Sequence, residues 1–395
     1  KTGKRSDAAH HYIYNQAHNP NLQLWVGKRV KRVIFEDKRA VGVEFTSDPA
    51  VCQDADLPSG TVRASKLVVV SAGAFGSPTI LERSGIGAEA VLKRCGIELL
   101  VNLPGVGENY QDHNGGFIPH IAADGVVTMD PLWRKEESVI QENLAQWKHN
   151  GRSLIAQNGS DAIMKWRPDD DELKSMGSAF EARWKEFFQD CPDKALAIFA
   201  FLGGYLYPVS TGSVHIKMRE DGKEELDFTT GFLDDPSDIV PLSFGYKRTR
   251  EILRRMPSYR EVSAGRPRFP DGSAAVCGEA SGPVDLNAPD IVYTPEDDQA
   301  IDEFHRNNVQ SAWHSLGTCA MKPEADQGAV DARLNVYGVT NLKVADLSIV
   351  PLNVGTNTYS TALLIGEKAA MIIAEDLGID CTACPLWWES TQARL

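Results

Sequence analysis

The sequence predicts an α/β protein, α+β overall, and three patterns support this prediction. Residues 67–70 form a continuous apolar run, which is typical of a strand buried on both faces of a parallel sheet. Residues 213–218 and 224–228 read as the two strands of an antiparallel hairpin. Residues 358–377 contain few helix breakers and carry apolar side chains at helical spacing before Gly378. The 395 residues have room for about two domains.

Further short elements precede the hairpin. Three segments alternate between apolar and polar side chains and are predicted to be strands, namely 21–26, 30–35 and 40–45. Residues 37–39 are predicted to form a turn between the last two of these strands. Ser77 and Pro78 follow the buried strand, and they suit the N-cap and the first position of a short helix.

The middle of the chain reads as a separate layer with three helices. Residues 139–149 have helical spacing. The acidic run at residues 169–172 is predicted to cap a second helix that runs through 184–188, since its acidic residues lie at the favourable end. Residues 236–238 are predicted to cap a basic helix through 246–255.

Composition and charge exclude several classes of protein. The net charge of −13 argues against nucleic-acid binding, which needs a basic face. No apolar run reaches the roughly 18 residues that a membrane-spanning helix needs. Seven scattered cysteines favour a reducing compartment over a disulfide framework. Cys381 and Cys384 form a Cys-x-x-Cys pair without a second ligand pair, so we expect no metal site.

Two polar residues stand out in the C-terminal quarter of the chain. His314 lies between Trp313 and Leu316, and Asn357 precedes the long predicted helix. A neutral histidine can accept a proton near pH 7, and an amide can hold an oxygen atom without competing for that proton. Each residue taken alone also fits a structural role, His314 as a hydrogen-bonded core histidine and Asn357 as a helix N-cap.

Longer motifs surround these residues. Residues 73–87 read Gly-Ala-Phe-Gly-Ser-Pro-Thr-Ile-Leu-Glu-Arg-Ser-Gly-Ile-Gly, and a loop rich in glycine and asparagine follows at 102–113. Four C-terminal stretches complete the pattern, namely 313–321, 335–339, 342–348 and 357–370. Together they resemble the signatures of the glucose–methanol–choline (GMC) flavin oxidoreductases, and within that family those of the fungal peroxisomal alcohol (methanol) oxidases.

The resemblance implies an FAD-binding, Rossmann-like domain and a substrate-binding domain built on an antiparallel sheet plus helices. We expect the first in residues 1–119 and 313–395, and the second in 120–312. No Gly-x-Gly-x-x-Gly motif follows a predicted strand, since the similar pattern at 85–90 follows a helix. We therefore expect the chain to lack the N-terminal dinucleotide-binding unit, which a missing segment or a further chain would supply.

The resemblance also implies a reaction. FAD would be the cofactor, and a primary, short-chain alcohol would be oxidised to an aldehyde while O2 becomes hydrogen peroxide. His314 would take the hydroxyl proton, and Asn357 would hydrogen-bond the alcohol oxygen. The residues expected to contact FAD are Val30, Ser71, Ala72, Trp313, Ala345, Asp346, Asn357 and Thr358.

Three other interpretations stay open, namely a GMC-fold dehydrogenase, a hydroxynitrile lyase and a non-catalytic assembly subunit. Trp387 and Trp388 suit a contact in a homo-oligomer, or packing within the same chain. The final residues Ala393, Arg394 and Leu395 resemble a peroxisomal address, with the cytoplasm as the alternative location. We expect neither nucleic acid nor a membrane as a partner.

Overall fold

The computed structural model describes residues 3–48, 50–51, 59–116, 118–160, 162–199, 203–262, 266–276, 278 and 282–380. The chain divides into two compact units, each built from discontinuous segments. Unit 1 comprises Lys1–Leu24, His113–Ser210 and Phe232–Trp313. Unit 2 comprises Trp25–Asp112, Thr211–Gly231 and His314–Leu395. No helix in the described ranges is long and apolar enough to cross a membrane.

Unit 2 begins with a three-stranded antiparallel sheet of β1 (Lys28–Glu36), β2 (Arg39–Ser47) and β3 (Ser59–Arg63). The strands predicted at 30–35 and 40–45 are confirmed. The turn between them is also confirmed, with positive φ at Asp37 and Lys38.

The strand predicted at 21–26 is wrong. An alternating pattern needs one buried face, but the apolar side chains of Leu22, Leu24 and Val26 are all exposed there. The segment has no strand assignment.

A parallel pair of strands lies at the centre of unit 2. β4 (Val68–Val70) pairs with β16 (Leu342–Val344), so the predicted strand and its parallel partner are confirmed. The expected burial on both faces is only partial, because Val69 is 40% exposed. The two strands run side by side although more than half of the chain separates them.

Helix α1 (Gly73–Arg83) follows β4 directly, so the prediction that Ser77 and Pro78 begin a helix is wrong. Gly73 has φ +75°, which lets the chain turn from the strand into the helix five residues earlier than predicted. Pro78 lies inside α1 and has no N–H to bond the carbonyl of Ala74. The hydroxyl of Thr318 donates to that carbonyl instead, at 2.6 Å.

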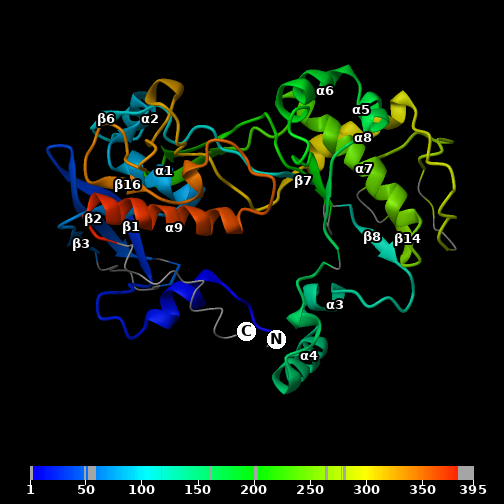
Figure 1. Ribbon diagram of the computed structural model, residues 1–395, viewed down its shortest axis with the longest axis horizontal. Helices are drawn as coiled ribbons and strands as arrows, with labels where there is room; N and C mark the ends of the chain where they lie inside the picture. The colour runs from blue at the N-terminus through cyan, green and yellow to red at the C-terminus, as the bar shows by residue number, and fades with distance from the viewer. Residues whose placement is uncertain are drawn as a thin grey trace. The chain divides into compact units, whose positions relative to one another are not determined.

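The long C-terminal helix α9 (Tyr359–Asp376) is confirmed, and Gly378 after it has positive φ. Its residues Ala369 and Ile372 join the core that also contains residues of β4, β16 and β1. Figure 1 shows the course of α9 in unit 2. Smaller elements complete unit 2, namely β5 (Ile86–Gly87), α2 (Glu89–Arg94), β6 (Val101–Asn102), β12 (Ser213–Met218) and β13 (Glu224–Thr229).

The hairpin β12–β13 forms where it was predicted. It groups with unit 2, whereas the family resemblance implied the substrate-binding domain expected in residues 120–312. The cause is local packing, because β12 lies against α1 and α2.

Unit 1 is built on a five-stranded antiparallel sheet with the order β15-β7-β11-β10-β9. Its strands are β7 (Asn114–Gly116), β9 (Met164–Trp166), β10 (Ala197–Phe199), β11 (Gly203–Tyr205) and β15 (Gln310–Ser311). A second antiparallel pair joins β8 (His120–Ala122) to β14 (Tyr259–Val262). The helices are α3 (Asp130–Trp133), α4 (Glu137–Asn150), α5 (Asp170–Ser175), α6 (Ser178–Arg183), α7 (Ile239–Arg254) and α8 (Pro295–Asn308).

The helices of the middle segment agree with the sequence in part. α4 and α7 form where they were predicted. Asp169 caps α5 through a capping box, but the predicted single helix breaks at Gly177, which has φ +75°. The chain then resumes as α6, which continues into a π-helical turn, Trp184–Phe188.

Candidate active site

The carboxyl ends of β4 and β16 bring four of the predicted cofactor-binding residues together. Ser71 and Ala72 follow β4, and Ala345 and Asp346 follow β16. The Ala345 N–H donates to the carbonyl of Val70 at 2.9 Å, and the Ser71 hydroxyl donates to the carbonyl of Ala345 at 2.8 Å. Ser71 and Ala72 are exposed. Ligands of open α/β sheets bind outside the carboxyl ends of parallel strands, which is where these residues lie.

The carboxylate of Asp346 fixes this edge. One of its oxygens accepts the N–H of Gly73 at 3.0 Å and the hydroxyl of Ser77 at 2.5 Å. The other oxygen accepts the N–H of Ser348 at 2.7 Å. Asp346 therefore ties the start of α1 to the end of β16.

His314 is held by its backbone on a buried carboxylate. The His314 N–H donates to Asp112 Oδ1 at 3.0 Å. The hydroxyls of Ser315 and Tyr110 both donate to Asp112 Oδ2, at 2.9 and 3.2 Å. Because Asp112 is completely buried, these hydrogen bonds are shielded from solvent.

The electrostatic surroundings of His314 favour its neutral form. Burial lowers the pKa of His314, and the negative charge of Asp112 opposes that shift without cancelling it. The imidazole is therefore neutral at pH 7 and able to accept a proton.

Gln111 connects the His314 segment to the segment that precedes Asn357. Its backbone pairs with Leu316, with N···O distances of 3.0 and 2.9 Å. Its side chain donates to the carbonyl of Pro351 at 3.2 Å and accepts the N–H of Asn353 at 3.1 Å. Consecutive residues of one loop, Gln111 and Asp112, thus position both segments.

Asn357 is not the N-cap of α9, so that structural alternative is wrong. Thr358 occupies the cap position without a side-chain cap hydrogen bond, and Asn357 precedes it as an exposed residue. The first N–H groups of α9 therefore have no side-chain acceptor from the cap residue. They give this end of the helix a partial positive charge.

The site residues fit a flavin in two respects. The N-terminus of α9 suits a negatively charged group, which reduced flavin carries near its N1 and O2 atoms. The amide nitrogen of Asn353 is buried without a hydrogen-bond partner in the described part of the chain. It is thus a donor in the segment leading to α9 that a polar cofactor atom can satisfy.

Two other predicted cofactor residues lie elsewhere. Val30 is in β1 opposite Phe45, in a different sheet of unit 2. Trp313 is 70% exposed, with φ +61°, and groups with unit 1.

Sequence reasoning missed Gln111 and Asp112. The predicted loop at 102–113 also contains their neighbour His113, which is 1% exposed and accepts the N–H of Ala312 at its carbonyl. The loop motif marked the region but did not distinguish its members. The described residues contain no group of three or more His, Cys, Asp or Glu side chains that could hold a metal ion.

Comparison with known proteins identifies the site's relatives. A family model described as GMC oxidoreductase matches residues 208–366, and the family's N-terminal model matches residues 1–115. The second match corrects the expectation of a missing N-terminal unit, since residues 1–115 themselves match that model.

Curated relatives include alcohol oxidases of yeasts. Alcohol oxidase 2 of Komagataella phaffii is 36% identical over 95% of this chain and 66% of its own length, and alcohol oxidase of Pichia angusta is 37% identical over the same shares. The chain thus spans just under two thirds of the length of these relatives. An oxygen-dependent choline dehydrogenase of Pseudomonas putida is 28% identical over 93% of the chain and 59% of its own length.

Solved structures share the fold. An FAD-dependent oxidoreductase from Chaetomium thermophilum has a TM-score of 0.75 at 23% identity, covering 96% of this chain and 66% of its own. Formate oxidase of Aspergillus oryzae has a TM-score of 0.76 at 19% identity, covering 95% and 64%.

Proposed function

Because the chain belongs to the GMC oxidoreductases, we propose that it acts in an FAD-dependent alcohol oxidase. A short primary alcohol and O2 would give an aldehyde and hydrogen peroxide. The observation that carries the proposal is His314, a half-buried histidine with a lowered pKa, held on the buried carboxylate of Asp112. The likeness to the yeast alcohol oxidases supports the substrate class.

The cofactor would be held by the edge of unit 2 already described. Ser71, Ala72, Ala345 and Asp346 would line it, and the N-terminus of α9 at Thr358 would favour its negative charge. Val30 and Trp313 remain proposed contacts. Bound FAD would supply the acceptor for the hydride that leaves the alcohol carbon.

The chain's own residues would handle the proton and the orientation of the alcohol. Neutral His314 would accept the proton of the hydroxyl group as the carbon–hydrogen bond breaks. The Asn357 amide would donate a hydrogen bond to the alcohol oxygen and so orient its carbon. The hydrogen bonds of Asp112 and Gln111 would keep the two segments in place.

Replacement of the proposed base tests this function. His314→Ala should lower the turnover of methanol or ethanol by about 10² to 10⁴, because a general base typically contributes that much. The bound flavin should remain, as read from its visible spectrum. His149→Ala, at an exposed position of α4, is the control and should leave turnover unchanged. Undiminished turnover in His314→Ala would remove the proposed role.

Two further measurements separate the alternatives. Oxygen consumption with methanol, ethanol and benzyl alcohol distinguishes an oxidase from a dehydrogenase, which reduces a dye but consumes little O2. A purified protein without flavin absorption would favour the assembly subunit.

The proposed location is the peroxisome. Ala393, Arg394 and Leu395 lie outside the described residues, as do Trp387 and Trp388, on which the proposed homo-oligomer contact rests. Deletion of the last three residues should move a fluorescent fusion, labelled at its N-terminal end, from peroxisomes to the cytoplasm. An unchanged punctate distribution would show that the tripeptide is not the address.

A further inference from the structure

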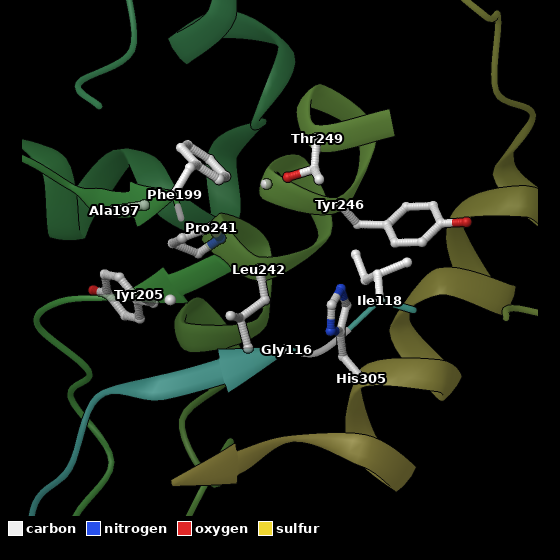
Figure 2. A pocket seen from close by; sticks show the side chains of 12 residues that line it. Gly116, Ile118, Ala197, Phe199, Tyr205, Pro241, Leu242, Tyr246, Thr249 and His305 are labelled. Atoms are coloured by element: carbon white, nitrogen blue, oxygen red, sulfur yellow. The ribbon is translucent and has the colours of Figure 1, made fainter. Parts of the chain in front are cut away.

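Unit 1 contains a small cavity in the described part of its chain. Helices α7 and α8 and strands β7, β10 and β11 form its walls (Figure 2). The positions that the centre of a water-sized sphere can occupy in this cavity fill about 20 Å³. This space is enough for one very small molecule. Its lining is mostly apolar and includes Ile118, Phe199, Pro241 and Leu242.

One ring nitrogen in this lining lacks a partner in the described part of the chain. His305 of α8 is 2% exposed, and its ring makes a hydrogen bond to the backbone carbonyl of Leu242. Its other nitrogen, Nε2, has no hydrogen-bond partner within the described ranges. In Figure 2 a ring nitrogen of His305 points into the space between Leu242, Ile118 and Tyr246.

The protonation state makes this nitrogen an acceptor. Burial lowers the pKa of His305 to about 4, although the hydrogen bond to Leu242 opposes the shift. The ring is therefore neutral at pH 7, and its one proton lies on the nitrogen that bonds Leu242. Nε2 presents a lone pair to the cavity.

We infer that this cavity binds a monohydric alcohol of one or two carbons, whose hydroxyl donates to Nε2 of His305 while its carbon end contacts Leu242 and Phe199. A water molecule would satisfy the same lone pair, but a buried water needs two to four polar partners and this lining offers few. An apolar gas would fit the walls but leave the buried nitrogen unpaired. A short alcohol satisfies both requirements.

The inference does not rest on the proposed oxidation, because it concerns a cavity within unit 1, whereas His314 and Asn357 belong to unit 2. The alcohol would be bound and not converted. Only two or three heavy atoms contribute contacts, so the expected dissociation constant is in the millimolar range or weaker.

Histidine-observed NMR on the flavin-loaded protein provides the test. The protein would be labelled with ¹³C at histidine Cε1 and carry His314→Ala, so that turnover does not consume the alcohol. Methanol and ethanol should shift the His305 resonance saturably, and tert-butanol, which is too large, should not. The resonance is assigned by its loss in His305→Phe, and His149→Phe, which removes an exposed ring, should leave the response intact.

A second variant keeps His305 and reduces the space. The Cβ added by Gly116→Ala would lie 3.6 Å from Cε1 of His305, an ordinary contact, so the fold should tolerate it. Its dissociation constant for methanol should rise several-fold. A shift with xenon but with neither alcohol would identify a gas cavity and overturn the inference, as would no saturable shift with any probe. If His314→Ala retained full turnover while the His305 resonance still shifted saturably, the proposed function would fail. The alcohol site at His305 would remain supported.

Discussion

At the scale of single residues, the proposed chemistry depends on how His314 is held. Its segment meets the loop at Asp112 although 202 positions separate the two residues. Nothing in the local pattern of either segment encodes this contact, since it arises from the fold. The motif therefore led to His314 and Asn357 but not to Asp112 or Gln111, whose roles depend on partners distant in the chain.

Asp112→Asn tests the positioning role through a pH profile. The Asp112 charge raises the pKa of His314 against the larger lowering effect of burial. Loss of that charge should lower the His314 pKa further, so the acid limb of kcat/KM should move to lower pH. The rate at pH 7 should also fall, by about tenfold, because asparagine restores only part of the hydrogen bonding to Ser315 and Tyr110.

Glu108→Gln is the comparison, since it removes a carboxylate in the same loop that does not bond the His314 segment. Its acid limb should coincide with that of the parent enzyme. A limb that moves equally in both variants would mean that general charge, and not the contact with Asp112, sets the His314 pKa.

At the scale of elements, periodicity predicted strands β1 and β2 and the long helix α9, but sequence signals did not place the start of α1. Ser77 and Pro78 are a good helix start in sequence terms, yet α1 begins at Gly73. The hydroxyl of Thr318 makes an internal proline acceptable, because it bonds the carbonyl of Ala74 that Pro78 leaves unpaired. A tertiary contact from the other end of the chain thus overrides a local signal.

Thr318→Val should therefore destabilise the protein. Valine keeps the shape of the completely buried threonine but leaves the Ala74 carbonyl unpaired, at a cost of about 1–3 kcal/mol. Denaturant unfolding measures this loss. Thr229→Val, at an exposed position of β13, should change the free energy of unfolding by less than about 0.5 kcal/mol. Equal effects of both substitutions would refute the assigned role of the Thr318 hydroxyl.

At the scale of the whole molecule, the sequence predicted the kinds of elements better than their grouping. Both units are discontinuous, and unit 2 gathers three separate stretches of chain. The hairpin β12–β13 looks the same in sequence whichever unit it joins. Buried polar contacts with α1 determine that the hairpin packs in unit 2. The alternation of apolar and polar residues along the hairpin does not predict these contacts.

The main such contact is His215 of β12. Its Nδ1 lies 2.6 Å from Glu82 Oε1 of α1, and its Nε2 lies 3.2 Å from Glu108 Oε1. Glu82 is completely buried and also accepts the N–H of Ile216 at 2.8 Å. The imidazole of His215 thus connects the hairpin to helix α1 and to the loop before Gln111. We expect these contacts to stabilise unit 2.

This arrangement predicts a defined dependence of stability on pH. Burial acts to lower the pKa of His215, but the carboxylates of Glu108 and Glu82 outweigh burial and raise the pKa to about 9. A histidine whose pKa is raised on folding stabilises the native state fully below its unfolded value of about 6.5. We therefore expect the free energy of unfolding to fall as the pH rises from about 6.5 through 9.

His215→Phe should cost about 3–5 kcal/mol at pH 6, because it leaves the Glu82 carboxyl buried without its partner. It should also abolish the fall between pH 7 and 9, whereas Glu108→Gln, at a half-exposed position, should cost less than about 1 kcal/mol. Urea unfolding at pH 6, 7.5 and 9 measures all three proteins. If the free energy of unfolding of His215→Phe fell equally between pH 7 and 9, the pH dependence would belong to other groups. The stabilising role assigned to His215 would then be wrong.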